Sequence, residues 1–131
     1  MERRAYERIN VQAKGSFVIS DDEKFIAEFV AYIDDISESG LKIKVDANEY
    51  DHIIDLIDTG SKISFQALES FELYGKEVTK IFNGNVNVVR KENDGDNFYI
   101  GCSIKPLTEP LQNYIEDRKI SIYIKRIHAV T

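Results

Sequence analysis

The chain has 131 residues, which suits one domain with one hydrophobic core. A content of 43% hydrophobic and 31% charged residues is typical of a soluble globular protein, and the net charge of −6 argues against general nucleic-acid binding. One cysteine excludes an internal disulfide framework, and no apolar stretch approaches the roughly 20 residues of a membrane span.

The N-terminal segment is basic on an otherwise acidic chain. Residues 1–14 carry four cations and two carboxylates, a net charge of +2, which leaves −8 for the remainder. The segment lacks the apolar core of a secretory signal, so we expect a cytoplasmic protein. We expect residues 1–10 to form a flexible arm. This arm either folds back as a solvated tail on the acidic surface or binds an anion as a mobile segment. Charge alone leaves both alternatives open.

Apolar and polar residues alternate with a period of two over most of the chain, which predicts β-strands. Six strands are expected, over residues 10–20, 24–34, 41–46, 62–67, 85–88 and 98–105. Residues 70–82 are apolar in places but hold no period. Residues 93–97, Asn-Asp-Gly-Asp-Asn, predict a hairpin turn and lack the ligand spacing of a calcium loop.

Two segments depart from this alternation. Apolar residues at helical spacing within 47–58 predict a short surface helix or turn, which Gly60 would end. After Pro106 the spacing predicts a C-terminal helix over residues 107–128, with Thr108 as its cap. Beyond Lys119 a strand competes with the helix, because alternate positions there are all isoleucine: Ile120, Ile122 and Ile124.

These elements predict a single domain over residues 1–131. The expected fold class is all-β with a C-terminal helix. Residues 11–106 would form a six-stranded antiparallel barrel of the Greek-key type. Closure of the barrel removes free sheet edges, which would otherwise pair with other chains.

No residue pattern indicates an enzyme. His52 and His128 have no neighbouring nucleophile or metal-binding set, and Cys102 lies in an alternating run typical of a small core residue. Paired carboxylates such as Asp34 and Asp35 fall at turns, where aspartate is common. The sequence also lacks the nucleophile-elbow, zinc-protease and phosphate-loop motifs. We therefore expect no catalysis, metal or cofactor.

Two short motifs carry the functional prediction: Arg4 and Arg8 form RxxxR before the first strand, and Asp35, Ser37 and Gly40 form DxSxxG after the second. Arginine can bridge O6 and N7 of guanine or two phosphate oxygens, and a carboxylate can accept bonds from guanine's N–H groups. Ser37 can bond the turn backbone or a ligand, and Gly40 permits a positive φ or close approach by a ligand. A site for a guanine-containing anion and a plain β-turn both remain open.

Together these motifs resemble the PilZ domain, a family of bacterial receptors for the second messenger cyclic di-GMP. The resemblance continues at residues 85–90 and 99–104, which are similar to the family's last two barrel strands, where a glycine is common near Gly101. It covers essentially the whole chain and implies a six-stranded barrel with a C-terminal helix.

The resemblance also implies the roles of the motif residues. Arg4 and Arg8 would take phosphate and guanine from a flexible arm, above a barrel face lined by the second motif: Asp35, Ser37 and Gly40. Arg3 would be an extra contact, and a basic residue there would favour an intercalated pair of ligands over a single one.

The leading hypothesis is thus a non-catalytic cyclic di-GMP receptor. Binding would order the arm and create a surface for an unidentified downstream protein. The alternative is a ligand-independent protein-interaction module, using apolar residues on the outer face of the second strand (Ile26, Val30 and Tyr32), unless these pack beneath the terminal helix. A nucleic-acid-binding barrel would need a basic groove that the −8 body lacks. We therefore expect neither nucleic acid nor membrane insertion.

Overall fold

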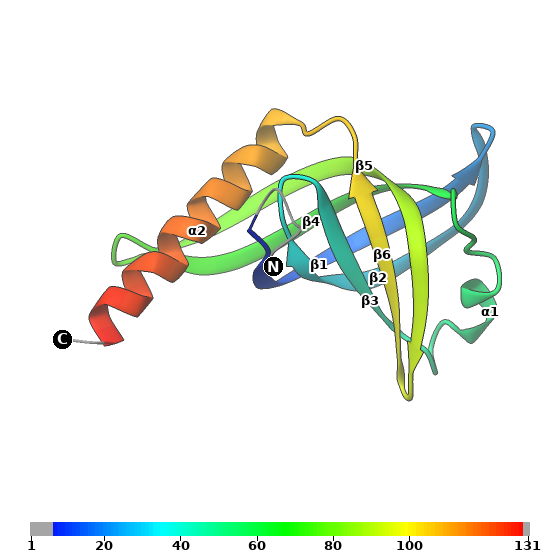
Figure 1. The fold of residues 1–131 in the computed structure, drawn as a ribbon, viewed down its shortest axis with the longest axis horizontal. Helices are drawn as coiled ribbons and strands as arrows, with labels where there is room; N and C mark the ends of the chain where they lie inside the picture. Colours follow the sequence, from blue (N-terminus) through cyan, green and yellow to red (C-terminus); the bar gives the residue numbers. More distant parts are fainter. Residues whose placement is uncertain (1–6, 130–131) are drawn as a thin grey trace, which may run out of the picture.

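In the computed structural model, which describes residues 7–129, six antiparallel strands close into a barrel that a C-terminal helix flanks (Figure 1). The ring order is β1-β2-β3-β6-β5-β4, and β4 returns beside β1 as in a Greek key. The predicted fold class is confirmed. The elements are β1 (Ile9–Asp21), β2 (Lys24–Ile36), β3 (Gly40–Asp46), α1 (Asp51–Ile54), β4 (Lys62–Leu73), β5 (Lys76–Asp94), β6 (Asn97–Ile104) and α2 (Glu109–Ala129).

The alternating residues point into the barrel and form one apolar core. At its centre Phe17 stacks on Phe29 and on Phe65, with ring centroids 5.3 Å and 5.6 Å apart. Three strands, β1, β2 and β4, contribute these rings, so the core joins segments that are distant in sequence. The closed and packed barrel therefore holds the turn between β2 and β3 in one position.

The barrel begins earlier than the sequence suggested. Ile9 and Asn10 belong to β1, where they pair with Ile36 and Asp35 of β2. The expectation that the arm extends to residue 10 is wrong, because Ile9 and Asn10 both pair in β1 and Ile9 is buried in the core, whereas the predicted first strand starts within one residue of the observed one. The rest of the expected arm up to residue 6, with Arg3 and Arg4, lies outside the described residues.

The fourth and fifth strands are much longer than predicted. They pair from Lys62 to Leu73 and join through a two-residue turn in which Tyr74 and Gly75 both have positive φ, 52° and 78°. The apolar alternation breaks from residue 69 onward because two charged residues, Glu69 and Lys80, occupy inward positions of these strands. These charges face α2: Glu69 lies beside Arg118, and Lys80 forms an ion pair with Asp117.

Helix α2 continues to Ala129, which excludes the competing strand after Lys119. It packs on β4 and β5 through Leu111, Tyr114 and Ile115, and the Tyr114 ring stacks 3.9 Å from that of Phe82. Among the described residues, no helix is both long and apolar enough to cross a membrane.

The other predicted helix is reduced to one turn, α1, within the expected range 47–58. Figure 1 shows α1 at the end of the barrel away from α2. The outer face of β2 stays open, since Ile26, Val30 and Tyr32 are all exposed and α2 packs elsewhere.

A buried polar cluster fastens α2 to the barrel. Glu69 accepts hydrogen bonds from the Tyr114 hydroxyl at 2.8 Å and from the Gln12 backbone N–H at 2.8 Å. The Nε of Arg118 lies 2.7 Å from Oε1 of Glu69, an ion pair without good hydrogen-bond alignment. Burial, and secondly the Glu69 carboxylate, raise the pKa of Tyr114, so its hydroxyl keeps its proton and donates.

Cys102 lies inside β6 and is buried. Burial raises the pKa of its thiol to about 12, so the thiol stays protonated near neutral pH. The prediction that it is a small core residue is confirmed.

Candidate ligand-binding site

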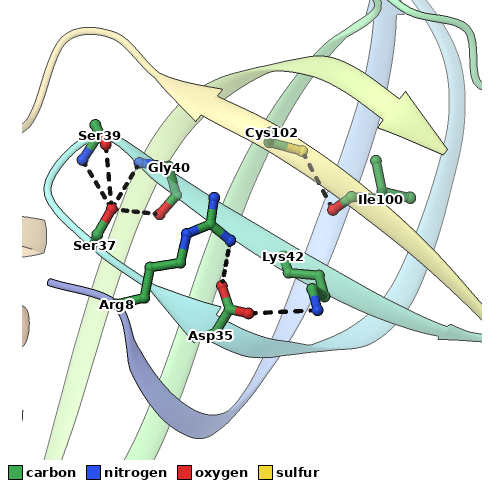
Figure 2. A network of polar contacts seen from close by, with 8 residues as sticks. All are labelled: Arg8, Asp35, Ser37, Ser39, Gly40, Lys42, Ile100 and Cys102. Atoms are coloured by element: carbon green, nitrogen blue, oxygen red, sulfur yellow. Dashed lines mark hydrogen bonds and ion pairs between the residues drawn. The ribbon is translucent and has the colours of Figure 1, made fainter. Parts of the chain in front are cut away.

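The two motifs meet through an ion pair between Arg8 and Asp35, 27 residues apart in the chain. Nη1 of Arg8 donates to Oδ1 of Asp35 at 3.1 Å, and the two side chains are 23% and 13% exposed. The register of β1 and β2 causes this meeting, because Asn10 pairs with Asp35 and brings the preceding Arg8 alongside. Figure 2 shows the guanidinium between the β2–β3 turn and Asp35.

Lys42, which the sequence analysis did not single out, completes this charge group. Its Nζ lies 3.6 Å from Oδ2 of Asp35, so a cation faces each carboxylate oxygen. A register shift in the pairing of β2 with β3 falls between Ile33 and Asp35, and such bulges re-aim side chains. Lys42 meets Asp35 because the two residues are cross-strand partners in the pairing of β2 with β3.

Ser37 shapes the turn between β2 and β3. Its Oγ accepts hydrogen bonds from the backbone N–H groups of Ser39 and Gly40, both at 3.3 Å. Its own N–H donates to the Gly40 carbonyl at 2.8 Å, and the residue is only 2% exposed. Of the two roles open from the sequence, the structure shows the bond to the turn backbone, and a direct ligand contact remains a prediction.

Gly40 is required by close packing of β3 on β6. A Cβ at this position would lie 2.8 Å from the carbonyl oxygen of Cys102, shorter than a real contact allows. Gly40 is not among the residues with positive φ, so that part of its expected role is wrong. The same Cβ would lie 3.9 Å from Nη2 of Arg8, which places Gly40 directly beneath the guanidinium.

We expect Gly40→Ala to destabilise the fold. Overpacking against a backbone oxygen costs roughly 1–3 kcal/mol in the free energy of unfolding, because the β3–β6 pair must separate. Urea denaturation measures this, with Ser39→Ala in the same turn as the control. Equal midpoints for Gly40→Ala and the wild type would show that the close contact does not constrain the turn.

Helix α2 also reaches the motif turn. Nζ of Lys119 donates to Oε1 of Glu38, inside DxSxxG, at 2.7 Å. A hollow of about 330 Å³ lies beside this contact, lined by the residues before and within β1 and by one side of α2: Glu7, Ile9, Lys119, Ile122, Tyr123 and Arg126. The candidate site is therefore bordered by the helix as well as by the barrel.

Of the predicted site residues, the structure brings four together: Arg8, Asp35, Ser37 and Gly40. Arg3 and Arg4 lie outside the described residues. Within residues 7–129 no group of three or more histidine, cysteine or carboxylate side chains could hold a metal ion. The arrangement offers one carboxylate, two cations and a tight backbone turn, which suit a ligand with both anionic and hydrogen-bond-donating groups.

Comparisons with known proteins agree with this fold. A family model described as "PilZ domain" matches residues 2–118. The Bacillus subtilis inhibitor of motility (MotI/DgrA) superposes with a TM-score of 0.60 at 14% identity, covering 100% of this chain and 54% of its own. The present chain thus spans about half the length of that protein.

A second solved structure, the PilZ domain with c-di-GMP of YcgR from Escherichia coli, superposes with a TM-score of 0.53 at 14% identity. The match covers 97% of this chain and 95% of that one. No curated protein sequence matches the chain. At this level of identity the likeness establishes a shared fold.

Proposed function

The chain belongs to the PilZ domain family, and from that premise we propose that it is a non-catalytic receptor for cyclic di-GMP. The structure of the E. coli YcgR domain with c-di-GMP supports this ligand. The observation that carries the proposal is the Arg8–Asp35 pair, which joins the two motifs on one face of the barrel.

The chemistry of the site suits this ligand, which has two phosphates and two guanines. Both oxygens of Asp35 face cations, Arg8 and Lys42. In our proposal guanine N–H groups replace these cations at Asp35, and the cations turn to phosphate and to the acceptor edge of the base. Two further cations of the N-terminal segment, Arg3 and Arg4, would also bind the ligand. A basic residue at position 3 would favour binding of an intercalated pair of ligands.

Ligand binding would be transmitted to the downstream protein through α2. Glu38 of the motif turn is bonded to Lys119, so a movement of the turn alters a contact of the helix. Oε2 of Glu38 is buried without a hydrogen-bond partner in the described part of the chain, which makes this contact sensitive to nearby charge. Tyr123 and Ile127 are exposed on the last turns of α2 and would meet the downstream protein.

A second candidate function is ligand-independent protein interaction. An apolar groove of about 440 Å³ crosses the outer face of β2, β1, β4 and β5. Val30, Leu68 and Ile81 line it and are all exposed. A pull-down that recovers the same partner with and without cyclic di-GMP, and loses it in Leu68→Ser, would favour this function.

Calorimetry with cyclic di-GMP tests the proposal. We expect the wild-type protein to bind at tens of micromolar ligand or below, and Asp35→Ala to weaken binding at least tenfold, because a charge-assisted bond contributes roughly 1.5–3 kcal/mol. Asp34→Ala, one residue away and outside the Arg8 pair, is the matched control. Absence of wild-type binding in this range would refute the receptor function.

A further inference from the structure

A row of four residues runs across the outer face of the barrel beside the Arg8–Asp35 pair. Asp35 on β2 pairs with Lys42 on β3, Lys42 with Gly101 on β6, and Gly101 with Arg90 on β5. Cross-strand partners project from the same face of a sheet. Neighbouring strands lie 4.7–4.9 Å apart, so the row spans about 14 Å, which is longer than one base.

Gly101 allows Arg90 to lie along this row. A Cβ on Gly101 would be 2.8 Å from Cγ of Arg90 and 3.1 Å from its Nε, so the arginine side chain rests directly on the strand. A register shift between Val88 and Arg90 marks a bulge at this point of β5. Among residues 7–129 the Arg90 side chain has no hydrogen bond or ion pair, and the residue is exposed, so its N–H donors are available to a ligand.

The row carries excess positive charge on an acidic chain. Arg8, Lys42 and Arg90 place three cations along a row that holds one carboxylate, Asp35, whereas the whole chain has a net charge of −6. The next outward row, Lys44, Tyr99 and Glu92, adds one charge of each sign and leaves this excess unchanged. Nζ of Lys42 also lies 5.4 Å from the centre of the Tyr99 ring, so an aromatic face borders the row.

We propose that Lys42 and Arg90 form a second phosphate-binding part of the site, on β3 and β5, which takes a phosphodiester of the nucleotide that Arg8 and Asp35 hold. This inference rests on the proposed cyclic di-GMP function. Lys42 is only loosely held at 3.6 Å, so its flexible side chain can leave Asp35 when a guanine arrives. Arg90 already lies flat on Gly101 and presents its planar fork to an anion.

The test is calorimetry with cyclic di-GMP on charge-neutralising variants. We expect Lys42→Gln and Arg90→Gln each to weaken binding roughly tenfold, as loss of one charge-assisted bond implies. Lys76→Gln removes the same charge from the other end of β5, beside its turn to β4, and should change binding less than threefold. Lys42→Arg should recover most of the affinity lost in Lys42→Gln.

Gly101→Ala tests whether the position of the Arg90 side chain matters as well as its charge. It leaves every charge in place but forces the Arg90 side chain off the strand, so we expect a loss similar to that of Arg90→Gln. Thermal unfolding of each variant confirms that the barrel is intact. If the wild type binds and the Lys42→Gln and Arg90→Gln variants bind as well as Lys76→Gln, the second phosphate site is overturned and the receptor function stands. Absence of wild-type binding would overturn both.

Discussion

Arg8→Ala is expected to weaken cyclic di-GMP binding by about a hundredfold or more. Arg8 is the member of RxxxR that the structure describes, and its guanidinium lies 3.1 Å from the Asp35 carboxylate. Its removal deletes charge-assisted bonds of roughly 1.5–3 kcal/mol each, and each 1.4 kcal/mol is about tenfold in affinity. It also leaves Asp35 with less compensation, and that carboxylate then repels an anionic ligand.

Three variants make the Arg8 result interpretable. Arg8→Lys keeps the charge but lacks the planar fork, so we expect an intermediate affinity. Lys76→Ala removes one charge from the start of β5, outside the site, and should bind nearly as the wild type. Arg8→Ala should retain the thermal unfolding midpoint to within a few degrees, since the pair is partly exposed. An Arg8→Ala protein with wild-type affinity would remove the proposed site.

Arg118→Ala is expected to lower the free energy of unfolding by about 3–5 kcal/mol. Glu69 and Arg118 are 8% and 12% exposed, and removal of one partner leaves a buried charge without its counter-ion. The variant also loses the contact of the guanidinium with the Phe71 ring, 4.9 Å from its centre. We expect the thermal midpoint to fall by roughly 10 °C or more, measured by circular dichroism.

A double-mutant cycle distinguishes the charge effect from lost packing. Glu69→Gln combined with Arg118→Met removes both charges and keeps the volume, so the pair should cost much less than the two single changes summed. Arg126→Ala, exposed on the same helix, is the control and should change stability by less than about 0.5 kcal/mol. Additive effects in the cycle would contradict a coupled buried pair.

The fold could be predicted wherever the apolar period was uninterrupted. β1, β2, β3 and β6 alternate cleanly, and their positions were found to within a few residues. The ends of β4 and β5 were missed because Glu69 and Lys80 take inward positions that a strand normally fills with apolar residues. Only the presence of α2 above those strands explains the two charges.

The site could be predicted in its residue types but only partly in its geometry. The motif spacing singled out Asp35 rather than its neighbour Asp34, but only the register of β1 on β2 shows that Asp35 meets Arg8. Gly40 was expected to serve a ligand or a turn, yet its constraint comes from the Cys102 carbonyl on another strand. Lys42 and Arg90 were not singled out, because the row that they form depends on the register of β3, β6 and β5.

The sequence by itself determined that this protein has six strands, a terminal helix and two motifs suited to a guanine-containing anion. Apolar periodicity and turn preference depend on residues that are neighbours in the chain, so they can be read directly from the sequence. Tertiary structure alone decided which charges meet: Arg8 with Asp35 across 27 residues, and Lys119 with Glu38 across 81. Such pairs depend on strand register and helix docking, which the packing of the whole barrel selects.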